Sequence, residues 1–159
     1  MQGIKRATDW GYSLFEFGLY GKRKKTNDLS PVHFIKLSLT DQNNKTVSDN
    51  FYWRGGRTAD YTDLNKLPKA SIKTTSTLAT ANGRSVIHAV IKNTGNSVAF
   101  AIHVQAISSK DGERILPAFM NDNYFTLMKG ESKEIDIDFD TALLPDGKYR
   151  LIAEPYNNK

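Results

Sequence analysis

The chain has 159 residues, a net charge of +5 and no cysteine, and 39% of its residues are hydrophobic. This length suffices for one buried domain, or one domain and part of another, but not for a (β/α)₈ barrel of roughly 200 residues or more. The missing cysteines exclude disulfides and thiolate metal sites. The basic run Lys22–Lys25 lacks interleaved aromatics, and no apolar run approaches the roughly 20 residues of a membrane span, so neither nucleic acid nor membrane is an expected partner.

Residues 1–30 give no clear element. The segment Asp9–Tyr20 carries Trp10, Leu14 and Phe17 at helical spacing, but its Tyr, Phe and Gly content favours a strand equally. Both alternatives stay open. No apolar stretch follows Lys5 and Arg6, so this chain is expected to carry no secretion signal.

Residues 31–66 read as a hairpin and a connection. Apolar and polar side chains alternate in Val32–Thr40, turn residues follow at 41–44, and Thr46–Trp53 can return as the partner strand. Gly55 and Gly56 end the hairpin, and the polar stretch after them has room for one helical turn.

Residues 67–159 contain seven short strand-like runs separated by turn signals such as Asn82-Gly83 and Lys129-Gly130. The runs are Ala70–Ala79, Ser85–Lys92, Ser97–Ile107, Arg114–Phe119, Tyr124–Met128, Lys133–Phe139 and Lys148–Ala153. Two of them indicate the buried face, because Phe100 to Ala106 and Ile135 to Phe139 place apolar residues at every second position. The opposite face, which includes His103 and Ile107, is expected to be largely solvated. This spacing predicts an all-β, antiparallel β-sandwich.

The acidic cluster near residue 136 is the one candidate for glycosidase chemistry, which needs two carboxylates about 5 to 10 Å apart. Alternation with buried residues instead puts four carboxylates on one solvent-facing row: Glu134, Asp136, Asp138 and Asp140. A calcium loop is a sharper alternative, but it would need glycine and irregular backbone among the acids. We therefore expect a solvated face and no catalytic residue.

Other cofactor sites find no support. His33, His88 and His103 fall on three different predicted strands, without a second ligand nearby in sequence. No glycine-rich phosphate loop precedes a helix. Neither a metal nor another cofactor is expected.

Two aromatic segments have a composition suited to sugar contact, since an aromatic face packs against apolar C–H surface while polar neighbours bind hydroxyls. The candidate residues are Tyr52, Trp53, Arg54, Asp122, Asn123 and Tyr124. Consecutive strand residues point to opposite faces, so at least one aromatic of each segment should be core. Core packing and contact with another domain are the alternatives to sugar binding.

These segments also carry a resemblance to a known family. The string Ser48–Arg54, the pairs Asp60-Tyr61 and Leu67-Pro68, and the string Asp122–Leu127 follow one another in an order and spacing that resemble the C-terminal region of exo-β-glucosaminidases of glycoside hydrolase family 2, which are relatives of the β-mannosidases. The resemblance covers about residues 31 to 140, and residues 1–30 stay unplaced.

The resemblance implies an immunoglobulin-like sandwich at residues 67–159, with residues 31–66 closing a preceding sandwich. It implies a non-catalytic domain that supports the catalytic barrel and neighbouring domains of a bacterial periplasmic or secreted hydrolase. No position matches the family's catalytic glutamates, so no catalytic role is carried over. An independent carbohydrate-binding module and an immunoglobulin-like protein-interaction module are the alternative functions.

Overall fold

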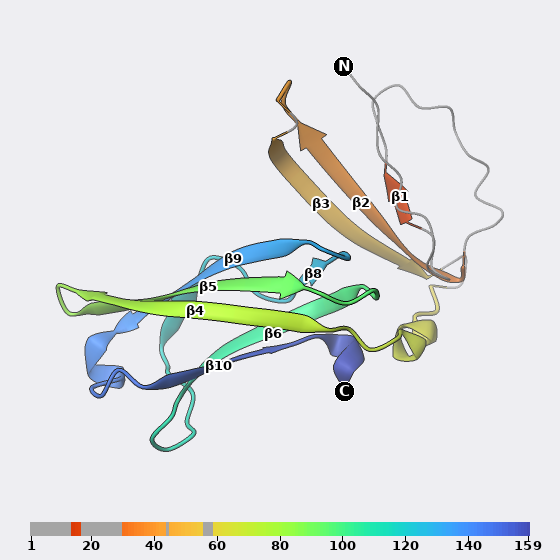
Figure 1. Cartoon of the computed structure of the whole chain (residues 1–159). Coiled ribbons are helices and arrows are strands. Elements are labelled where there is room, and N and C mark those ends of the chain that lie inside the picture. Colours follow the sequence, from red (N-terminus) through yellow and green to blue (C-terminus); the bar gives the residue numbers. More distant parts are fainter. Residues whose placement is uncertain (1–13, 17–29, 44, 56–58) are drawn as a thin grey trace. The chain divides into compact units, whose positions relative to one another are not determined.

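The computed structural model describes residues 14–16, 30–43, 45–55 and 59–159 (Figure 1). The chain divides into two compact units, Met1–Lys66 and Leu67–Lys159, and each is described by itself. Of the ambiguous segment Asp9–Tyr20, only Leu14–Glu16 is described, and it is a strand. The basic run Lys22–Lys25 lies outside the described residues.

The first unit contains a sheet with the strand order β1-β2-β3. Its strands are β1 (Leu14–Glu16), β2 (Val32–Thr40) and β3 (Thr46–Gly55). β2 and β3 form the predicted antiparallel hairpin, from the pair Val32 and Gly55 to the pair Thr40 and Thr46. β1 pairs with β2 in parallel, which the sequence did not indicate.

Local polar contacts set the turns of this unit. The Asp41 carboxylate accepts hydrogen bonds from the backbone N–H groups of Asn43 (2.8 Å) and Lys45 (2.9 Å), which closes the hairpin turn. After β3, a Cβ on Gly55 would lie 2.5 Å from the Asp60 carbonyl oxygen, so only glycine fits this approach. The connection ends in the 3₁₀ turn η2 (Thr62–Lys66), where one helical turn was predicted.

The second unit is a sandwich of two antiparallel sheets with seven strands in the fully described residues 67–159, as the sequence predicts (Figure 1). The four-stranded sheet has the order β4-β5-β9-β7, with β4 (Ile72–Ala81), β5 (Arg84–Asn93), β9 (Ser132–Asp140) and β7 (Ala118–Met120). The three-stranded sheet has the order β10-β6-β8, with β10 (Tyr149–Glu154), β6 (Ala99–Ser108) and β8 (Phe125–Leu127). The 3₁₀ turns η3 (Thr141–Leu143) and η4 (Tyr156–Asn158) follow β9 and β10.

The core of the second unit consists of the inward-facing residues of both sheets. Six of its members are fully buried or nearly so: Ile87, Ile91, Ile102, Ile135, Ile137 and Phe139. The β4–β5 hairpin turns at Asn82 and Gly83, which both have positive φ, as a two-residue turn of this kind requires. Along β9 the carboxylates alternate with the buried residues and face outward, as predicted.

Three sequence-based details were wrong. The strand predicted at Arg114–Phe119 is only an isolated bridge from Arg114 to Ile107, followed by β7 from Ala118, because Pro117 has no N–H to donate to a ladder. The strand predicted at Tyr124–Met128 begins at Phe125, because Tyr124 has left-handed backbone geometry. Ile107 was expected on a wet face but is 5% exposed, because the segment that contains Arg114 folds back on β6.

No helix within the described ranges has both the length and the apolar character needed to cross a membrane. The helical elements of those ranges are single 3₁₀ turns of three to five residues.

Candidate contact site at the loop Asn121–Tyr124

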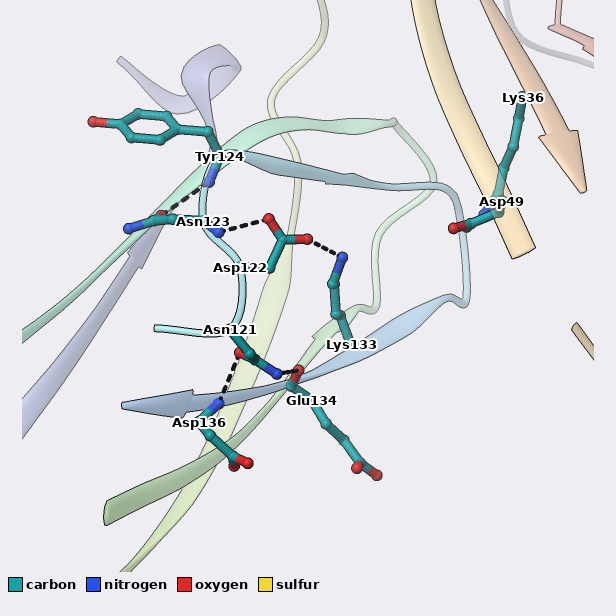
Figure 2. Close-up of polar contacts among 9 residues, drawn as sticks. All are labelled: Lys36, Asp49, Asn121, Asp122, Asn123, Tyr124, Lys133, Glu134 and Asp136. Atoms are coloured by element: carbon teal, nitrogen blue, oxygen red, sulfur yellow. Dashed lines mark hydrogen bonds and ion pairs between the residues drawn. The ribbon is translucent and has the colours of Figure 1, made fainter. Parts of the chain in front are cut away.

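The loop of residues 121–124 joins β7 of the four-stranded sheet to β8 of the three-stranded sheet, so it crosses from one layer of the sandwich to the other. Figure 2 shows that its polar side chains are hydrogen-bonded within the second unit, while the Tyr124 ring is directed away from the Asp122–Lys133 pair. The loop contains three of the candidate residues that the sequence indicates.

Asn121 extends the pairing of β7 with β9 through its side chain. Its Oδ1 accepts a hydrogen bond from the Asp136 N–H at 3.0 Å, and its Nδ2 lies 3.4 Å from the Glu134 carbonyl oxygen (Figure 2). The side-chain amide thus takes over the donor and acceptor roles of a peptide group where the β7 ladder ends.

Asp122 holds the next part of the loop. Its carboxylate accepts a hydrogen bond from the Asn123 N–H at 2.7 Å and forms an ion pair with Lys133 on β9. The Lys133 ammonium also lies 5.2 Å from the centre of the Phe125 ring. Both partners of the ion pair are more than a third exposed, so this pair orients the loop and adds only modestly to stability.

Asn123 occupies the place of a missing strand residue beside β6. Its Oδ1 accepts from the Val104 N–H (2.8 Å) and from the Tyr124 N–H (2.9 Å), and its Nδ2 donates to the Val104 carbonyl oxygen (3.0 Å). One side chain therefore satisfies both backbone groups of Val104 and also fixes the backbone of the next residue.

Tyr124 is the exposed aromatic residue of the loop. It has a φ of 59°, a region that costs a residue with a Cβ atom about 1 kcal/mol or more, and its side chain is 65% exposed. Its ring stacks on that of His103 in β6, with the centroids 4.7 Å apart and the planes 8° from parallel. The stack and the Asn123 hydrogen bonds hold an exposed aromatic ring in a defined place.

The second aromatic segment that the sequence indicates, Phe51 to Arg54, lies on β3 of the first unit. The strand period separates Tyr52 and Arg54, which share one face, from Trp53 on the other. Phe51 is half-buried beside Phe34, but Tyr52 is 48% exposed and Trp53 is 50% exposed, so neither is the core residue expected there. This segment and the 121–124 loop belong to separately described units.

Two carboxylates of the acidic row of β9 contact β5 side chains on the sheet surface, Asp136 through a hydrogen bond and Asp138 through an ion pair. Asp136 lies 2.7 Å from His88 and Asp138 lies 2.8 Å from Arg84, and both pairs are exposed. Hydrogen bonds from backbone N–H groups lower the pKa of two other carboxyls, Asp60 and Asp111, in their turns. A general acid would need the opposite shift. Among the described residues, no cluster of three or more ligand side chains could hold a metal ion.

Sequence reasoning missed His103 as part of this site, where it supplies the support of the Tyr124 ring. The register that pairs Ile102 with Phe125 brings the two residues together, and no local signal marks that pairing. The structural role of the asparagines was also missed. Asn93, Asn157 and Asn158 form similar bridges to backbone groups, for example from Asn157 to both Phe100 N–H and Val98 carbonyl.

Comparisons with known proteins agree with this architecture. The sequence profile described as the exo-beta-D-glucosaminidase Ig-fold domain matches residues 50–158. The chain is 29% identical over 126 residues to an exo-beta-D-glucosaminidase of Arthroderma benhamiae, which covers 68% of the chain and 14% of that protein. It is 29% identical over 150 residues to an exo-beta-D-glucosaminidase of Streptomyces avermitilis, which covers 81% of the chain and 16% of that protein.

Among solved structures, the exo-chitosanase CsxA of Amycolatopsis orientalis superposes with a TM-score of 0.75 at 26% identity, over 82% of this chain and 18% of that one. The chain thus spans 14 to 18% of the length of these relatives. The profile match extends over more than half of the chain and includes both the end of the β2–β3 hairpin and nearly the whole sandwich. The chain therefore belongs to the family of exo-β-D-glucosaminidase Ig-fold domains.

Proposed function

We propose that this chain is a non-catalytic accessory region of a glycoside hydrolase of the exo-β-D-glucosaminidase type, and that it supports the catalytic barrel and neighbouring domains of that enzyme. The observation that carries this proposal is the family match over residues 50–158, combined with the small share of each relative that the chain covers. In this view, residues 31–66 close a preceding β-sandwich and residues 67–159 form the next one.

The chemistry of the second unit supports an accessory role. Glycoside hydrolysis needs a carboxylic acid with a raised pKa opposite a second carboxylate. The carboxylates that gather on β9 instead lie along an outer strand face, where Asp136 is hydrogen-bonded to His88 and Asp138 forms an ion pair with Arg84. This arrangement suits a solvated surface. The enzyme as a whole would act outside the cytoplasm, in the bacterial periplasm or the medium.

The proposal is tested by assaying the purified chain with chromogenic β-glucosaminide and β-mannoside, and by reading the coding sequence upstream of Met1. We expect no turnover above the buffer control and an upstream (β/α)₈ barrel. The supporting role is then measured by expressing the barrel-containing enzyme with and without this chain. We expect the enzyme that lacks this chain to have a lower midpoint of thermal unfolding. Turnover by the chain alone, or the absence of an upstream barrel, would contradict the accessory role.

A further inference from the structure

Tyr124 stands apart from the other exposed apolar side chains of residues 67–159. The large apolar residues that are well exposed there are Val90, Leu116, Phe119, Tyr124 and Leu143. Of these, Tyr124 alone lies beside the three-stranded sheet β10-β6-β8; the others lie on β5 and β7, in the segment before β7, or in η3. The outer face of the three-stranded sheet thus carries a single prominent aromatic ring.

The placement of this ring is costly, and the surrounding residues enforce it. Left-handed backbone geometry favours Gly, Asn and Asp, yet position 124 carries a large aromatic residue with a φ of 59°. Asn123 fixes the Tyr124 N–H at 2.9 Å, and His103 supports the ring. Backbone strain that the surroundings maintain concentrates at ligand-binding positions, because it fixes a side chain before the ligand arrives.

The side chains around Tyr124 on this face are mixed: Gln105 and Glu154 are polar, whereas Ile152, the cross-strand partner of Gln105, is apolar and partly buried. Gln105 Nε2 lies 3.4 Å from His103 Nδ1, and Glu154 on β10 is the cross-strand partner of His103, so its exposed side chain projects from the same face. Adjacent strands are about 4.8 Å apart, which places the Glu154 backbone about 10 Å from that of Tyr124. A carboxylate at this range attracts a cationic ligand at low ionic strength.

One flat aromatic ring among hydrogen-bonding groups suits a sugar better than a protein surface. The centre of a protein–protein interface is a contiguous apolar patch, whereas within residues 67–159 Tyr124 is the one well-exposed large apolar side chain on this face. A pyranose ring instead offers an apolar C–H face for stacking and hydroxyl groups for an amide or a carboxylate. The carboxylate of Glu154 further favours a sugar with a free ammonium group.

We propose that the exposed face of the Tyr124 ring binds a pyranose ring of a β-linked glucosamine oligosaccharide, with Gln105 and Glu154 as its polar surroundings. The choice of an amino sugar rests on the proposed function, whereas the site itself rests on the loop geometry. His103 and Asn123 act as positioning residues that hold the ring and its backbone.

The test is a ¹H–¹⁵N NMR titration of the isotope-labelled chain with glucosamine oligosaccharides. We expect shift changes centred on residues 101–105 and 123–126, with a Kd of about 10⁻⁴ to 10⁻³ M. Tyr124→Gly removes the ring while it suits the positive φ, so binding should weaken at least about tenfold and the unfolding midpoint should stay within a few degrees. Tyr124→Phe should bind as the parent chain does. Phe119→Ala is the matched control, because it removes an equally exposed ring from the other sheet and should leave binding unchanged.

The role of the amine is tested with N-acetylated and glucose oligosaccharides of the same length. We expect the free amine to bind about two- to fivefold more tightly at low salt, and Glu154→Gln to remove this preference without removing binding. Equal affinity for all three sugars would overturn the amino-sugar assignment.

Three results would overturn the site. The first is a titration up to about 10 mM sugar that shows no shift changes, or shift changes only outside residues 101–105 and 123–126. The second is a Tyr124→Gly variant that binds sugar as the parent chain does. The third is a Tyr124→Gly variant whose only defect is weaker association with the separately expressed barrel. The last would make Tyr124 a protein contact. Failure here leaves the accessory role intact, whereas turnover by the chain alone would remove the accessory role and leave sugar binding at Tyr124 standing.

Discussion

Residues 67–159 bury their apolar side chains between two sheets, whereas the hairpin of β2 and β3 leaves large apolar side chains exposed on both of its faces. In the sandwich, Phe139 and Ile137 are fully buried. In the hairpin, Leu39 is 54% exposed and Val47 is 64% exposed. Both regions have alternating strand sequences. In the hairpin, however, the buried residues are confined to one end, at Val32, Phe34 and Gly55, whereas in the sandwich the second sheet covers the inward face of the strands. Folding stability should therefore concentrate in residues 67–159.

The largest expected effect is the difference between the sandwich and the β2–β3 hairpin as separate fragments. We expect a fragment of residues 67–159 to unfold in urea with one cooperative transition and a free energy of unfolding of about 5 kcal/mol or more, since it contains a complete core. A fragment of residues 30–66 should show no transition, because a small isolated sheet is marginal in water. Far-UV circular dichroism during urea titration measures both. Loss of β-structure in the 67–159 fragment would refute the division.

Within the sandwich, two phenylalanines on neighbouring strands give the next largest contrast. Phe139 on β9 is fully buried, and Phe119 on β7 is 69% exposed. We expect Phe139→Ala to lower the free energy of unfolding by about 3–5 kcal/mol, because it leaves a cavity between the sheets. Phe119→Ala should change it by less than about 0.5 kcal/mol. Chemical denaturation of both variants checks the pair, and comparable losses would mean that the outer face also contributes to the core.

A smaller contrast separates two asparagines of one turn. Asn93 is fully buried and its side chain donates to the Ser97 (2.7 Å) and Leu127 (3.0 Å) carbonyl oxygens and accepts from the Gly95 N–H (3.0 Å). Asn93→Ala would take this donor away from the Ser97 and Leu127 carbonyl oxygens, whereas the Gly95 N–H would keep its hydrogen bond to the Ser71 carbonyl oxygen at 3.0 Å. We expect the substitution to cost about 2–3 kcal/mol. Asn96 is exposed, so Asn96→Ala should cost less than about 0.5 kcal/mol. Equal, small effects in urea titrations would show that water replaces the Asn93 bridge.

The sequence predicts the sandwich well because its signals are local. Asn82-Gly83 marks a two-residue hairpin turn, and the alternation around Ile135 and Ile137 marks the buried face of β9. The errors lie where tertiary contacts override the two-residue alternation of buried and exposed side chains along a strand. Ile107 is buried where the later segment with Arg114 pairs with it, and Tyr124 lies outside the strand where the Asn123 side chain takes the place of a strand residue beside Val104.

The candidate site could be predicted only in part for the same reason. The Asn-Tyr composition of the loop indicates a contact residue, but the support from His103 depends on the register between β6 and β8. That register is irregular between Ala99 and Ile102, where the Ala101 N–H donates to Thr126 Oγ1 at 3.1 Å instead of to a ladder. Side-chain bridges of this kind replace regular pairing, and a pattern of apolar residues does not encode them.

The smallest expected effect concerns one acidic turn in each unit. The Thr62 N–H lowers the pKa of Asp60 and the Glu113 N–H lowers that of Asp111, each below the ordinary value of 3.8. A depressed pKa means that the carboxylate stabilises the fold above the pKa of the unfolded chain, and that this contribution is lost as the pH falls through the folded value. NMR titration of the side-chain carboxyls should place both midpoints below 3.8. In the 67–159 fragment, Asp111 should keep its low midpoint, because its partners Glu113 and Ser108 lie in the same unit. A midpoint that returns to the ordinary value in the fragment would show that this turn depends on residues 1–66, against the independence of the sandwich.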